Sequence, residues 1–178
     1  MQLVVLGLNH KTVSVDIREQ FAISEESARS GLRHLDEQEG IEEAVVLSTC
    51  NRTEIYAVLK NGAARKTLYQ FFLALSGNSE AKKEYFFYFE GEACIRHLFE
   101  VASGLDSMVI GESQILNQIK TAYTMALSEK ATKTILNTLF HRAITTGKRV
   151  RTETRISYSA VSVSYAAVKL AEKILGGL

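Results

Sequence analysis

Proline is absent from the 178 residues, and cysteine occurs only twice. Without proline, the ends of helices must be marked by glycine and asparagine instead. The two cysteines, Cys50 and Cys94, cannot form the framework of a disulfide-stapled secreted domain, so we expect reduced thiols and a cytoplasmic location. No stretch approaches the roughly 20 apolar residues of a membrane span, and the first residues lack the basic region of a signal peptide. We therefore expect no membrane partner.

An excess of charge of either sign is absent as well, since 21 basic and 20 acidic residues leave a formal net charge of +1. A nearly neutral chain has no global field that attracts nucleic acid, so any such binding requires a local basic patch. The hydrophobic fraction of 46% is ordinary for a globular protein, and the length is sufficient for one good core.

The hydrophobic pattern of the first half alternates between strand and helix periods. Apolar or alternating runs predict strands, and apolar residues three and four apart predict amphipathic helices. The predicted strands cover residues 3–8, 44–47, 55–59 and 85–89, and the predicted helices cover residues 25–35 and 64–75. The order β-α-β-β-α-β predicts an α+β fold, a βαββαβ antiparallel sheet with its two helices on one face.

The second half is predicted to be a helical subdomain. A helix after Gly91 carries Cys94 on its apolar face, where this thiol is a packing residue. Gly104 ends that helix and opens a loop, and further helices follow after Glu112, from Ile135 and from Val163. We divide the chain into residues 1–90, which carry the candidate nucleophile, residues 91–155 and residues 156–178.

Cys50 is the most informative residue, because it stands in a polar corner between two predicted strands. Arg52 lies two positions away, and nearby positive charge favours the thiolate, which is the nucleophilic form of cysteine. The alternative is a small buried hydrophobic residue at a strand end. His10, at another strand end, has a structural and a catalytic interpretation of similar weight. A zinc site is a weak further option, because the cysteines and histidines show no paired ligand spacing.

The residues around Cys50 resemble the catalytic signature of glutamyl-tRNA reductase. The signature reads Ser-Thr-Cys-Asn-Arg-Thr-Glu at residues 48–54. Further strings resemble the same family in the same order, at residues 7–12, 104–116, 148–154 and 160–164. Each string is moderately specific, and together they are very specific.

The resemblance implies that Cys50 attacks the ester of glutamyl-tRNA to form a thioester. NADPH then reduces the thioester to glutamate-1-semialdehyde, a precursor of 5-aminolevulinate and the tetrapyrroles. The family binds NADPH in a Rossmann domain and forms a homodimer through a third domain. No Gly-x-Gly-x-x-Gly follows a strand here, so we expect the catalytic N-terminal domain alone, with only esterase activity. Residues 156–178 would be the helix leading to the NADPH-binding domain. The implied partners are glutamyl-tRNA and glutamate-1-semialdehyde aminotransferase, and no metal is expected.

The resemblance also implies roles for individual residues. Arg52 pairs with the glutamate carboxylate, and His97 assists the acyl transfer as a base or a polariser. The rest of the glutamyl pocket comprises Thr49, Asn51, Ser107, Glu112, Ser113, Gln114 and Gln118. Ser113 stands where the family has proline, so it is placed there by backbone position only. On residue chemistry alone, two glutamines one turn apart on a helix are normally solvated filler, and the alternative is that they hold an anionic or amide-bearing ligand beside Ser107 and the helix N-terminus.

A basic cluster near the end of the long helix is the candidate contact for tRNA phosphates, although such clusters usually only solvate a helix end. It comprises Arg142, Lys148, Arg149, Arg151 and Arg155. The competing interpretation of the whole chain is a non-catalytic tRNA-binding or regulatory module, in which Cys50 is structural or redox-sensing.

Overall fold

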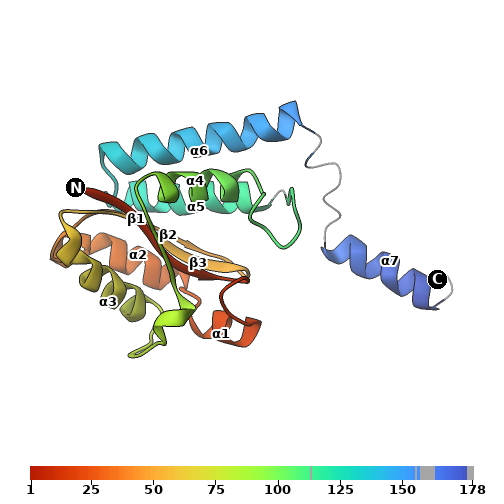
Figure 1. Cartoon of the computed structure of the whole chain (residues 1–178), viewed down its shortest axis with the longest axis horizontal. Helices are drawn as coiled ribbons and strands as arrows, with labels where there is room; N and C mark the ends of the chain where they lie inside the picture. Colours follow the sequence, from red (N-terminus) through yellow and green to blue (C-terminus); the bar gives the residue numbers. More distant parts are fainter. Residues whose placement is uncertain (113, 155, 157–162, 176–178) are drawn as a thin grey trace.

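An antiparallel sheet of four strands runs through the middle of the computed structural model, which describes residues 1–112, 114–154, 156 and 163–175 (Figure 1). Across the sheet the strands follow the order β2 (Ile41–Ser48), β3 (Arg52–Leu59), β1 (Gln2–Asn9) and β4 (Phe87–Glu90). All eight residues of β3 are buried, because this strand pairs on both sides and is covered on both faces.

One face of the sheet is covered by α2 (Glu25–Arg33) and α3 (Arg65–Leu75), which lie below it in Figure 1. Their buried residues recur at helical spacing, with Ala28 and Leu32 in α2 and Leu68 and Phe72 in α3. Ser24 caps α2 by accepting a hydrogen bond from the N–H of Ser27 at 3.1 Å. This arrangement confirms the predicted α+β fold with a βαββαβ order.

The opposite face is covered by the helical half of the chain. In Figure 1, α4 (Glu92–Ala102), α5 (Gln114–Ser128) and α6 (Thr134–Glu153) lie above the sheet, and α7 (Val163–Leu175) lies apart from these layers. The first helix packs against β1 and β4, the second against β2, and the third against β2 and β3. None of the described helices is both long and apolar enough to cross a membrane. The division into units at residues 90 and 155 stays a prediction.

Two local features differ from the sequence prediction. The fourth strand begins at Phe87 and not at Tyr85, because the short 3-10 helix η3 (Lys83–Tyr85) turns the chain before Phe87 pairs with Gly7. A short helix, α1 (Val15–Gln20), was not predicted because none of its residues is buried and it therefore has no apolar stripe. Two further 3-10 turns, η1 (Leu35–Glu37) and η2 (Gly62–Ala64), lie in connections.

A buried carboxylate joins the sheet to α6. Glu43 in β2 is 3% exposed, and its oxygens accept hydrogen bonds from the N–H groups of Lys133, Ile135 and Leu136 at 2.7, 3.2 and 2.9 Å. These N–H groups belong to the first turn of α6 and have no partner within the helix. The negative charge also stabilises the positive end of the helix dipole.

Replacing this carboxylate should therefore destabilise the fold. We expect Glu43→Ala to lower the free energy of unfolding by about 2 kcal/mol, because three buried N–H groups lose their acceptor. The neighbouring Glu42→Ala is the matched control, since Glu42 forms only surface ion pairs with Lys133 and Lys60. Urea unfolding measures both variants, and equal losses in the two would contradict the capping role.

Candidate active site

Cys50 lies in the middle of the three-residue connection between β2 and β3, and it is exposed. Thr49 holds this turn closed, because its N–H donates to the carbonyl of Arg52 at 2.8 Å. The hydroxyl of Thr49 also accepts hydrogen bonds from the N–H groups of Asn51 and Arg52, each at 3.2 Å. The turn contains no glycine, so the threonine side chain fixes the backbone that presents the thiol.

Two basic residues from other segments contact the turn. The backbone N–H of His10, just after β1, donates to the carbonyl of Asn51 at 3.1 Å. Nε of Arg18, in α1, donates to the carbonyl of Cys50 at 3.2 Å. Burial lowers the pKa of His10, and neighbouring cations lower it further, against the opposing effect of the Asp106 carboxylate. The turn is therefore bordered by a neutral imidazole and a guanidinium.

Behind the turn, three polar side chains share one face of β3 and are buried. Arg52, Glu54 and Tyr56 are 1%, 0% and 0% exposed. Nη1 of Arg52 donates to Oε1 of Glu54 at 2.8 Å, and the hydroxyl of Tyr56 donates to Oε2 at 2.7 Å. Gly7 of β1 makes room for this carboxylate, because a Cβ there would lie 2.8 Å from Cγ of Glu54. That close approach explains the glycine in the string at residues 7–12.

His97 joins this group from α4. Its Nε2 lies 3.0 Å from Oε1 of Glu54, and its ring packs against Phe87 and Phe89 with centroids 5.0 and 5.3 Å apart. The side chain is 7% exposed. His97 is therefore linked to the Cys50 turn through Glu54 and Arg52, which lie in consecutive inward positions of β3.

The loop at residues 104–111 reaches the same group through Asp106. Nη1 of Arg52 donates to Oδ2 of Asp106 at 3.2 Å, Nη2 donates to its carbonyl, and Lys11 forms an ion pair with Oδ1. The N–H of Gly111 donates to the carbonyl of Gly104 at 2.9 Å, which closes the loop at its base. Both glycines have positive φ, at +75° and +84°, a conformation that other residues rarely adopt.

These contacts set the charges of the group. Burial by itself would raise the pKa of Glu54, but Arg52 and His97 outweigh it and hold that pKa below its usual range. The pKa of Asp106 is lowered in the same way, by Lys11 and Arg52 against burial. The pKa of Arg52 is raised by both carboxylates, despite burial. At neutral pH this buried network therefore contains two carboxylates compensated by cations.

Cys94 is the other thiol, and it differs from Cys50 in every respect. It is fully buried, and burial together with the charge of Glu54 raises its pKa to about 12. A thiol with such a pKa is protonated and unreactive at neutral pH. The interpretation of Cys94 as a packing residue is confirmed.

The predicted glutamyl-pocket residues are distributed over the turn, the loop and α5. Ser107 follows Asp106 and is half-buried. Gln118 lines a surface hollow of about 280 Å3 together with Ser48, two residues before Cys50. Gln114 is exposed at the start of α5, and Ser113 lies outside the described residues. Their role in binding a substrate stays a prediction.

The predicted basic cluster does not form one free patch. Nη2 of Arg151 donates to the carbonyl of Glu112 at 2.8 Å, so this side chain ties α6 to the loop. Arg149 forms an ion pair with Glu153 at 3.0 Å. Arg142 and Lys148 are exposed, and Arg155 lies outside the described residues. Binding of tRNA by this cluster stays a prediction.

Sequence reasoning missed four members of the group: Glu54, Tyr56, Asp106 and Lys11. A signal was present in β3, where polar residues 52, 54 and 56 occupy alternate positions, and the positions between and after them are apolar from Ile55 onward. Asp106 had no such signal, because only the folded loop brings it to Arg52. Arg18 was missed because α1 has no buried face.

The described residues do not fit a nicotinamide cofactor. All strand pairs in the described part are antiparallel, whereas dinucleotides bind at the carboxyl ends of parallel strands. No group of three or more His, Cys, Asp or Glu side chains in the same part is placed to hold a metal ion.

Comparison with known proteins places these features in one family. A family model described as "Glutamyl-tRNAGlu reductase, N-terminal domain" matches residues 6–154. The glutamyl-tRNA reductase of Geobacter metallireducens is 52% identical over 180 residues, which cover 100% of this chain and 42% of the relative. That of Trichlorobacter lovleyi is 49% identical with the same coverage.

A solved structure gives the same result. Glutamyl-tRNA reductase from Methanopyrus kandleri matches with a TM-score of 0.77 and 37% identity, over 96% of this chain and 39% of that one. The chain thus spans about two fifths of the length of the curated relatives it matches.

The lowered pKa values predict sensitivity to acid. A carboxyl group whose pKa is lower in the folded state stabilises the fold above its unfolded pKa, and this contribution is lost as the pH falls. We expect the melting temperature to fall below about pH 4, and to fall less steeply in Asp106→Asn. The exposed Asp36→Asn serves as the control and should follow the wild type. An Asp106→Asn curve parallel to the wild type would contradict the charged network.

Proposed function

Because this chain belongs to the glutamyl-tRNA reductase family, as the N-terminal domain, we propose that it performs the acyl-transfer half of that reaction with Cys50 as the nucleophile. The observation that carries the proposal is the contrast between the two thiols. Cys50 is exposed on a turn that Thr49 holds and basic groups border, whereas Cys94 is buried and protonated.

The proposed substrate is glutamyl-tRNA, in which glutamate is esterified to the terminal ribose. The thiolate of Cys50 attacks the ester carbonyl, and a carbon–sulfur bond forms as the carbon–oxygen bond to the ribose breaks. The ribose oxygen takes up a proton and leaves as the free hydroxyl of the tRNA. His97 assists this transfer as a base or a polariser, and it is connected to the Cys50 turn through its contact with Glu54, which binds Arg52.

Arg52 is the proposed partner of the substrate's side-chain carboxylate. Its guanidinium is 1% exposed, and two of its nitrogens already bind the carboxylate and the carbonyl of Asp106. A substrate carboxylate has the same charge as Asp106, so we propose that it replaces Asp106 on Arg52 when the loop at residues 104–111 moves outward. Glu112 then has the charge to bind the α-ammonium group of the glutamyl moiety.

The second half of the reaction requires a hydride donor that the described residues do not hold. In the family's reaction, NADPH would supply the hydride that converts such a thioester to glutamate-1-semialdehyde for tetrapyrrole biosynthesis. Without that step, water hydrolyses the thioester, and the 178 residues act as a glutamyl-tRNA esterase. We also propose that the full-length enzyme forms a homodimer and passes the aldehyde to glutamate-1-semialdehyde aminotransferase.

Trapping the acyl group tests the nucleophile. We expect a glutamyl adduct in the intact-protein mass after mixing with glutamyl-tRNA and quenching in acid. The adduct should be absent from Cys50→Ser and unchanged in Cys94→Ala, because only the exposed thiol can reach the ester. Release of glutamate that depends on Cys50, without an adduct, would mean that the thioester forms and is hydrolysed before the quench.

The opposite result has an equally definite meaning. If tRNA binds but the ester stays intact in the wild type, Cys50 is not the nucleophile in these residues. The chain would then act as a tRNA-binding or regulatory module without catalysis of its own.

A further inference from the structure

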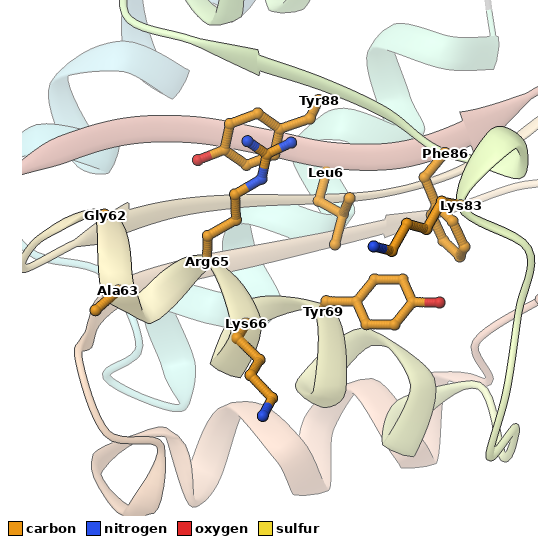
Figure 2. Close-up of a pocket in the computed structure, with 9 residues that line it drawn as sticks. All are labelled: Leu6, Gly62, Ala63, Arg65, Lys66, Tyr69, Lys83, Phe86 and Tyr88. Atoms are coloured by element: carbon orange, nitrogen blue, oxygen red, sulfur yellow. The ribbon is translucent and has the colours of Figure 1, made fainter.

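A hollow of about 500 Å3 lies on the α3 face of the sheet, beside β4 (Figure 2). We call it the β4 hollow, and its main lining residues are Leu6, Arg65, Tyr69, Lys83, Phe86 and Tyr88. In Figure 2, Arg65 extends from the start of α3 to the ring of Tyr88, and the ammonium group of Lys83 points into the space near Leu6. The hollow is open to solvent, and its volume is within the range of ordinary ligand sites.

The β4 hollow is separate from the active site. Leu6 lies opposite Ile55 and Tyr88 in the register of the sheet, so the three share the face covered by α3. Glu54 and its partner Tyr56 belong to the alternate positions of β3 and face the helices of the other layer. Nothing in the proposed chemistry at Cys50 uses this second site.

Three cations border the hollow without carboxylate partners. Arg65, Lys66 and Lys83 take part in none of the ion pairs formed by the described residues. Two of them occupy the first turn of α3, which contains no acidic residue. Positive charge is unfavourable at that end of a helix, because the helix dipole is positive there. An anion in the hollow would relieve this repulsion.

Three aromatic rings, those of Tyr69, Phe86 and Tyr88, also line the hollow and are held in place. The guanidinium carbon of Arg65 lies 3.8 Å from the centre of the Tyr88 ring, which is a cation–π contact. The hydroxyl of Tyr69 donates to the carbonyl of Ala81 at 3.0 Å, and its ring meets Phe86 edge-on at 5.4 Å. The hollow therefore offers fixed aromatic rings beside cations that have no carboxylate partner, which is the combination that binds a base and its phosphates.

We propose that the β4 hollow binds one unpaired nucleotide near the 3′ end of the tRNA, with its base against Tyr88 and Tyr69 and its phosphates against Arg65, Lys66 and Lys83. This proposal rests on the proposed function, which supplies the RNA. The open shape favours a nucleotide within a chain, because a site for a free nucleotide encloses most of its ligand. Leu6 lies three residues before Asn9, or about 10 Å along the strand from the end that pairs with Arg52. That distance is spanned by a few nucleotides.

Binding of uncharged tRNA to the whole chain tests the proposal. The double variant Arg65→Gln/Lys83→Gln should weaken binding about tenfold at roughly 0.1 M salt and reduce the slope of log Kd against log salt by about two. Tyr88→Leu should weaken binding about tenfold as well, but with the wild-type salt slope, because it removes stacking and no charge. The altered side chains are exposed or half-buried, and circular dichroism checks that the variants are folded.

The matched control is Lys120→Gln/Lys130→Gln, which removes the same charge from exposed positions away from the hollow. Its affinity and salt slope should stay close to those of the wild type. A second readout is acylation of Cys50 by a glutamate ester that carries no RNA, which the variants of the hollow should leave unchanged.

Each result separates the two proposals. Wild-type tRNA affinity in the variants of the hollow, or an equal loss in the control, overturns the RNA site. The RNA site is also overturned if AMP binds in the hollow but the variants of the hollow keep wild-type tRNA affinity, because the hollow would then be a site for a small molecule. If the variants lose tRNA affinity but neither ester acylates Cys50, the RNA site is supported and the acyl-transfer function fails.

Discussion

The structure depends on a guanidinium that is buried between two carboxylates. Arg52 contacts Glu54, its neighbour on the same strand face, and Asp106, which arrives from a loop 54 residues later. A buried charge is costly unless it is paired and hydrogen-bonded, so each member of this group requires the others. The position of the loop, the burial of His97 and the room left by Gly7 all follow from this requirement.

The Cys50 turn and the loop at residues 104–111 are both attached to Arg52, but the turn is fixed more firmly than the loop. The Cys50 turn leads directly into the first residue of β3, and Thr49 fixes its backbone through hydrogen bonds to Arg52. The thiol is therefore presented to solvent by a strand that is buried along its whole length. The loop at residues 104–111 is held differently, by the side chain of Asp106 and by backbone hydrogen bonds near its base, where the N–H of Leu105 donates to the carbonyl of Glu100 and that of Gly111 to the carbonyl of Gly104. In the reaction proposed above, a substrate carboxylate that competes with Asp106 for Arg52 would open that loop.

Sequence periodicity was sufficient for the layers of the fold, because buried strands and amphipathic helices leave a regular apolar pattern. It was insufficient for α1, which buries nothing, and for the start of β4, where the turn at Lys83–Tyr85 sets the boundary. At the site, the string around Cys50 directed attention to Arg52, and the resemblance to a family supplied the role that is proposed for it. Asp106 and Arg18 could not be placed, since their proximity to the turn is created only by packing over long sequence separations. Unpaired cations at the β4 hollow leave no periodic signal either.

Hydrogen exchange of the backbone amides tests most directly whether the Arg52–Asp106 interaction holds the loop on the site. Removal of the Asp106 charge should leave the amides of β3 protected, since they depend on strand pairing. In Asp106→Asn, the amides of residues 104–112 should exchange faster, on the order of tenfold, while Asp36→Asn leaves them unchanged. Unchanged protection of the loop in Asp106→Asn would contradict the account, because some other contact would then hold the loop in place.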